Sequence, residues 1–112
     1  MLKVKYTLDL LKIQQDDKYL VSDVVYSAEQ KFARYGLQKV GEGEFVNVPG
    51  NEEHYAQMWD TIFGLAKQEW FAPYVTEFLW MNSDEGEHEN DFAIDDLISF
   101  FKEKQYGLFK KE

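Results

Sequence analysis

The sequence predicts an α+β fold in which helices cover an antiparallel sheet. The chain opens with a strictly alternating apolar and polar run, and two amphipathic helical patterns follow, with β-favouring segments between and after them. Apolar residues make up 45% of the chain and aromatic residues 17%, which is enough to build a core. At 112 residues, the length matches one domain, and we expect residues 1–112 to form it.

The first predicted element is a strand over Leu2–Leu10. Its apolar side chains share one face, as expected for a half-buried strand. The opposite face carries Lys3, Lys5, Thr7 and Asp9. The polar run Gln14–Lys18 then predicts a turn.

A helix and a hairpin are expected next. Apolar residues recur with helical spacing from Val21 to Tyr35, with Ser22 as the predicted N-cap and Gly36 as the stop. Residues 37–40 and 44–48 favour strands, and the glycines between them predict a hairpin.

The second helix has the clearest pattern, a broad apolar stripe from Tyr55 to Trp70 with Asn51 as its cap. Pro73 ends it, and Tyr74–Met81 follows as a strand that is apolar on both faces. After a loop over residues 82–90, a last helix is expected from about Asp91. Its apolar face would carry Ile94, Leu97, Ile98 and Phe101.

This order, β-α-β-β-α-β followed by a C-terminal helix, is the ferredoxin-like arrangement, an antiparallel sheet with helices on one face. Strict alternation along the last strand would put Val75, Leu79 and Met81 on one side of the sheet. An apolar face without helices needs a cover. A second copy of the chain, making a homodimer, is the simplest cover, and the C-terminal helix folding back is the alternative.

Composition excludes several classes. No cysteine is present, so thiolate catalysis and disulfides are ruled out. No apolar run approaches the roughly 18 residues that a membrane span needs, and no signal-peptide pattern appears, so we expect a cytoplasmic protein. Residues 41–96 carry one basic and 14 acidic side chains. Such a segment argues against broad, non-specific nucleic-acid binding.

Several segments resemble the virulence-associated protein D (VapD) family. They are Tyr26–Leu37, Glu44–Asn47, the helix running into Glu69-Trp-Phe71, and the step Leu8-Asp9-Leu10. The closing stretch Asp91–Lys102 is similar too, so the resemblance covers nearly the whole chain.

The resemblance implies a ferredoxin-like homodimer, related to the small ferredoxin-like subunit of CRISPR adaptation complexes. Members act as endoribonucleases, some as toxins paired with an antitoxin. By this resemblance Asp9 is the catalytic residue, acting as acid or base or binding a divalent ion, Mg²⁺ or Mn²⁺. Such ions prefer oxygen ligands. Lys3, Lys5, Thr7 and Lys12 would hold RNA.

The chain departs from the family pattern at two places. Glu42-Gly43 stands where the family has a Gly-Ser step, and Thr76–Met81 lacks the family's two arginines, which would suit phosphate. The alternative hypothesis is therefore a non-catalytic acidic interaction module: an inactive relative, an antitoxin- or immunity-like partner, or a nucleic-acid mimic. His54 and His88 lack the spacing of a metal site.

Overall fold

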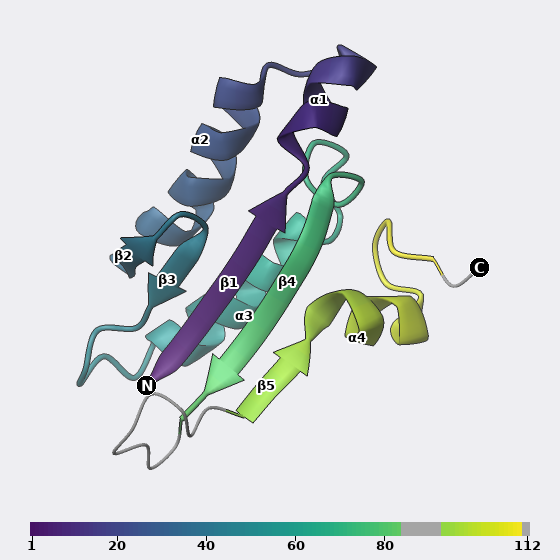
Figure 1. Ribbon diagram of the computed structural model, residues 1–112. Coiled ribbons are helices and arrows are strands. Elements are labelled where there is room, and N and C mark those ends of the chain that lie inside the picture. The colour runs from purple at the N-terminus through teal and green to yellow at the C-terminus, as the bar shows by residue number, and fades with distance from the viewer. Residues whose placement is uncertain (84–92, 111–112) are drawn as a thin grey trace.

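The computed structural model describes residues 1–83 and 93–110, and within them it contains a five-stranded antiparallel sheet and four helices. The elements are β1 (Leu2–Leu8), α1 (Leu10–Asp16), α2 (Val21–Ala33), β2 (Gln38–Gly41), β3 (Glu44–Val46), α3 (His54–Leu65), β4 (Val75–Asn82), β5 (Ala93–Asp96) and α4 (Leu97–Lys104). The strands lie in the order β2-β3-β1-β4-β5, so β1 is central. Figure 1 shows α2 and α3 together behind the sheet. The predicted α+β class with an antiparallel sheet is confirmed.

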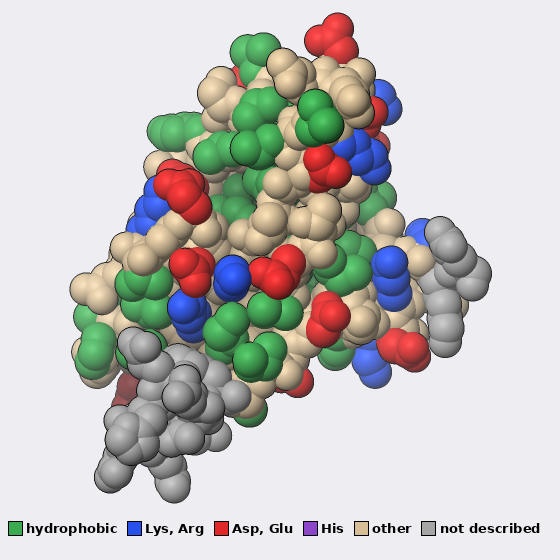
Figure 2. Space-filling view, in the orientation of Figure 1, with side chains coloured by type: hydrophobic (Ala, Val, Ile, Leu, Met, Phe, Trp, Pro, Cys, Tyr) green, Lys and Arg blue, Asp and Glu red, His purple; other side chains and the backbone are tan. Residues whose placement is uncertain are grey.

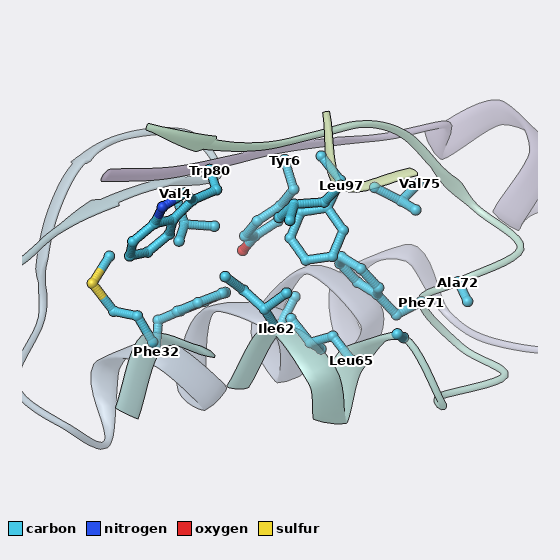
Figure 3. Close-up of a cluster of buried hydrophobic side chains, with 14 of the residues drawn as sticks. Val4, Tyr6, Phe32, Ile62, Leu65, Phe71, Ala72, Val75, Trp80 and Leu97 are labelled. Carbon is cyan, nitrogen blue, oxygen red and sulfur yellow. The ribbon is translucent and has the colours of Figure 1, made fainter. Parts of the chain in front are cut away.

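The core lies between the sheet and these helices (Figure 3). Alternation along β1 turns Val4 and Tyr6 toward the helices, as the sequence predicted, and both are buried. The same layer includes Phe45 from β3 and Phe78 and Trp80 from β4. The helices contribute Ala28, Phe32, Met58, Ile62 and Leu65. Burying this apolar surface is the main force that holds the helices on the sheet.

The predicted turn at residues 14–18 is confirmed only at Asp17 and Lys18, and it is wrong for residues 14–16. The chain forms helix α1 over most of this stretch, and β1 ends at Leu8 rather than at Leu10. Two features explain this result. Asp9 caps the helix N-terminus, and Ile13 is fully buried against Val24 and Tyr74 in a small second cluster. The reversal comes only at Asp17, whose φ of 52° ends the helix.

The second half of the chain also departs from the predicted elements. Helix α3 ends at Leu65, so Trp70 lies in the connection to β4 rather than on the helix. Residues 93–96 form strand β5, where a helix was expected. They do so because they pair with the edge of β4 in antiparallel register. Ile94 is therefore on an exposed strand. Helix α4 begins at Leu97, and its residues Leu97 and Phe101 are buried as predicted.

A β-bulge changes the predicted faces of β4. Leu8 pairs with Val75 but Thr7 pairs with Glu77, so one extra residue, Thr76, is inserted in β4. The insertion turns Val75 into the core, where it belongs to the same buried cluster as Phe78. Val75 consequently does not share a face with Leu79 and Met81, which corrects the strict alternation expected from the sequence.

Part of the expected acidic loop, residues 84–90, and the expected helix start at Asp91 lie outside the described residues. Among the residues that are described, no helix is long and apolar enough to cross a membrane.

Candidate functional site

Asp9 lies where the sequence placed it, directly after β1, but its carboxylate has a structural role. Its Oδ1 accepts a hydrogen bond of 3.0 Å from the backbone N–H of Lys12 and so caps α1. Its backbone N–H donates to the carbonyl of Tyr74, over 2.7 Å, and ties the strand end to the beginning of β4. The residue is half-buried.

The polar face of β1 forms ion pairs within the sheet. Lys3 Nζ lies 3.1 Å from Glu44, and Lys5 Nζ lies 3.3 Å from Glu77. The Thr7 hydroxyl is 3.5 Å from the same Glu77 carboxylate. The three side chains predicted to hold RNA on this strand are therefore already next to carboxylates of β3 and β4, which compete with a phosphate for them.

Lys12 lies apart from this row of charges. Its Nζ donates to the carbonyl of Pro73 over 3.1 Å and stands 5.7 Å from the ring centre of Tyr74. Tyr74 in turn donates a hydrogen bond of 3.0 Å to Asp16, and burial together with this carboxylate raises the pKa of its hydroxyl. These contacts join α1 to the start of β4.

The helix-free face of the sheet carries both apolar and charged side chains, as Figure 2 shows. Leu79 and Met81 project onto it and are half-buried, and Ile94, opposite Met81 in the register, is 60% exposed. On the same face, Lys3 lies opposite Met81 and Lys5 lies opposite Leu79 in the register. This face is the one on which a second copy was expected.

Metal binding by a single chain finds no support in the described residues. Nowhere in residues 1–83 and 93–110 do three His, Asp or Glu side chains gather in a way that could hold an ion. Asp9 offers one carboxylate, already engaged as a helix cap. Divalent ions such as Mg²⁺ need several oxygen ligands, so Asp9 of one chain does not fit such an ion.

His54 is a buried structural residue. Its Nδ1 accepts from the backbone N–H of Val48 over 3.0 Å, and its Nε2 lies 2.9 Å from the carbonyl of Tyr35, to which it donates in the matching tautomer. The ring thus links the end of α2 to the segment between β3 and α3. Both ring nitrogens are therefore engaged with backbone groups.

A cavity of about 310 Å³ opens beside the end of β1, between α2 and the β2–β3 turn. Its charged lining residues are Glu29 and Glu42, and Lys39 Nζ bridges them at 2.8 and 3.4 Å. The hydrogen bond to Glu29 is the main cause of the raised pKa of Lys39. Tyr6 also lines the cavity. Burial, and then the two carboxylates, raise the pKa of its phenol.

A second cavity, of about 410 Å³, lies at the opposite edge of the sheet, where β5 passes into α4. Its lining combines aromatic and acidic side chains: Trp59, Asp95, Asp96, Leu97, Ser99, Phe100 and Glu103. Sequence reasoning missed this site because it assigned Asp95 and Asp96 to a helix. The adjacent pair Asp95-Asp96 followed by Leu97 could have signalled it, since an Asp before an apolar run is a common N-cap.

The chain matches no protein-family model, no curated protein and no solved structure. The resemblance to VapD proteins therefore remains a prediction from the sequence.

Proposed function

We propose that this protein is a non-catalytic, acidic interaction module. One observation carries the proposal: the groups that an RNA-cleaving site would need are used for internal contacts. Asp9 caps α1, Lys3 pairs with Glu44, and Lys5 pairs with Glu77. A carboxylate that stabilises a helix and lysines that stabilise a sheet are explained by folding alone.

The charge distribution supports the same proposal. The chain has a formal net charge of −9. Exposed acids on helices, strands and connections add to it, among them Asp23, Glu52, Glu69 and Asp95. A strongly acidic surface repels nucleic acid and favours basic partners. Binding to a basic partner protein, of the antitoxin or immunity kind, or occupation of a basic nucleic-acid site, follows from this chemistry.

The proposal includes a ferredoxin-like unit as the scaffold. The first four strands lie in the order β2-β3-β1-β4, and α2 and α3 make the two connections between parallel strands. Strand β5 and helix α4 are then additions at one edge of that unit.

A VapD-like endoribonuclease is the second candidate. The observation that favours it is the position of Asp9, half-buried immediately after the central strand, with Lys12 one helical turn away. In this proposal two copies meet through Leu79 and Met81 on the helix-free face and bring their Asp9 residues together. Asp9 would act as acid or base, or the two together would bind Mg²⁺ or Mn²⁺.

One experiment separates the two candidates. Purified protein is incubated with RNA in Mg²⁺, Mn²⁺ or EDTA, beside Asp9→Ala and Asp9→Asn. Asn retains the helix cap but removes the carboxylate chemistry. We expect no cleavage by any of the three proteins. Cleavage by the wild type that both variants lose, at equal oligomer content on size exclusion, would instead establish the nuclease.

A further inference from the structure

The outer edge of the sheet at β5 has three properties of a peptide-binding site. It is the last strand of the sheet, it carries one carboxylate, that of Asp95, without an ion-pair partner in the described part of the chain, and it borders the aromatic cavity of about 410 Å³.

The first property is that β5 is an edge strand in the described part of the chain. Strand β5 pairs with β4 on one side, and no strand in the described part of the chain pairs with its other side. All four of its residues, Ala93–Asp96, are exposed. An edge strand presents backbone N–H and C=O groups to which an extended peptide can add.

The second property is the direction of the side chains of β5. The pairing register with β4 determines which of them project on the helix side of the sheet and which on the helix-free side. Asp95 lies opposite Trp80 of β4, whose side chain points into the core, so Asp95 projects on the helix side. Ile94 lies opposite Met81 and projects on the helix-free side. A peptide residue placed beside Asp95 would therefore point toward the cavity, and its two neighbours would point away from it.

The third property is the chemistry of the cavity. Its aromatic wall consists of Trp59 and Phe100, with ring centres 6.4 Å apart. The indole Nε1–H of Trp59 is buried and finds no acceptor among the described residues. Asp95 has no hydrogen-bond or ion-pair partner in the described part of the chain, whereas Asp96 caps α4. Carboxylates beside aromatic faces suit a guanidinium or ammonium group.

We propose that β5 binds an extended segment of a partner protein as an added strand, with an Arg or Lys side chain entering the cavity between Trp59, Asp95 and Phe100. The inference rests on the proposed interaction function and names the surface and the partner's chemistry. The partner segment alternates, with a basic residue opposite Asp95 and apolar residues opposite Ile94 and Asp96.

Charge disfavours a second copy of this chain as the occupant. If two β5 strands paired edge to edge, Asp95 and Asp96 of one copy would lie against the same acidic strand of the other. Like charges directly opposite each other on neighbouring strands are destabilising. The acidic edge therefore disfavours pairing with the β5 strand of a second copy and favours pairing with a basic strand.

The test is a titration of ¹⁵N-labelled protein with the blocked peptide acetyl-Thr-Val-Arg-Val-Thr-amide, followed by heteronuclear NMR. The peptide has the same residue order in both directions, so the parallel or antiparallel sense of binding does not matter. We expect shifts of the amides of Ala93–Asp96 and of the Trp59 indole N–H. A peptide with Glu in place of Arg should produce none of them.

Two kinds of variant locate the contacts. Asp95→Asn should weaken binding roughly fivefold, the size of an exposed ion pair. Phe100→Leu keeps an apolar side chain but removes the aromatic ring, and should weaken binding about two- to fivefold by removing a cation–π contact. Glu69→Gln, which removes an exposed acid from the α3–β4 connection, is the matched control and should have no effect. Thermal unfolding of each variant verifies that it is folded.

Whether the peptide binds as an added strand can be tested separately. Two further peptides carry N-methyl groups on alternate residues, one on the odd and one on the even positions. An added strand points every second N–H toward β5, so one peptide should retain binding and the other should lose it. Equal behaviour of the two would overturn the added strand.

Failure of the β5 binding site can be distinguished from failure of the proposed interaction function. If the peptide shifts other residues, or if Asp95→Asn binds it unchanged, this site is wrong and the interaction module stands. If no shifts appear, the site is also wrong. Only RNA cleavage that depends on Asp9 would refute the interaction module itself.

Discussion

Asp9 shows how one residue supports two interpretations. From the sequence, a carboxylate at the end of an alternating strand and beside lysines is either a solvated strand-end residue or, as was predicted, part of an active site. The geometry adds a second role, because the side chain caps α1 over 3.0 Å. Its role in stability can be separated from any role in catalysis by comparing substitutions that differ only in capping.

We expect Asp9→Ala to lower the free energy of unfolding by about 1 kcal/mol, the usual cost of a lost N-cap. Asp9→Asn should stay within a few tenths of a kcal/mol of the wild type, because the amide oxygen accepts the same hydrogen bond. Urea denaturation measures both values. An equal loss in the two variants would mean that charge, not capping, stabilises this position.

At the scale of elements, the β2–β3 hairpin is built around Gly43. This residue has φ of 66°, and its carbonyl accepts a 2.9 Å hydrogen bond from the N–H of Tyr6 on β1. A Cβ at this position would collide with the carbonyl oxygen of Tyr6. The hairpin can therefore approach the central strand only because the position has no side chain.

Substitution tests this approach with a matched control. Gly43→Ala should destabilise the protein by more than Gly50→Ala, because Gly50 has a similar φ of 88° but open space around its position. The control carries only the left-handed strain of about 1–2 kcal/mol. The additional loss of stability in Gly43→Ala, relative to Gly50→Ala, measures the cost of the collision with β1. Thermal or urea unfolding gives the difference, and equal losses would contradict the close approach.

At the scale of the whole molecule, the core contains a polar atom that has no hydrogen-bond partner among residues 1–83 and 93–110. Tyr6 is 5% exposed, its ring stacks on Phe32 at 5.9 Å, and its hydroxyl has no hydrogen-bond partner among the described residues. Burial raises the pKa of this phenol, and Glu29 and Glu42 add to the shift. The folded state thus favours the neutral form.

The sign of the pH dependence follows from linkage. Because the folded pKa of Tyr6 lies above the ordinary value of 10.0, the unfolded chain loses its proton first, and stability falls as pH rises above about 10. Tyr6→Phe removes this titration and an unsatisfied buried hydroxyl. We expect it to be as stable as the wild type or more so at pH 7, and to lose less stability between pH 9 and 11.

Urea unfolding at pH 7, 9 and 11 checks this prediction, with Tyr26→Phe as the control because Tyr26 is 63% exposed. A Tyr6→Phe protein that is clearly less stable at pH 7 would indicate that the hydroxyl has a partner. In that case the core would contain a hydrogen bond that the described contacts lack.

The sequence alone was sufficient for features that depend on local periodicity. Alternation along β1 identified Val4 and Tyr6 as core, and the helical spacing located α2 and the apolar stripe of α3, because side-chain direction follows backbone geometry. The fold class followed from the order of these elements. The position of Asp9 at the end of β1 was also readable, but its capping role was not, since the helix after it was taken for a turn.

Only the tertiary structure decided the features that depend on distant partners. Ile13 makes α1 a helix because Val24 and Tyr74 bury it, residues 93–96 form a strand because the edge of β4 is next to them, and Thr76 bulges so that Val75 enters the core. The cavity between Trp59 and Asp95 joins residues 36 positions apart in the sequence. The local sequence pattern shows which side chains are suited to burial. Long-range contacts determine which residues bury them.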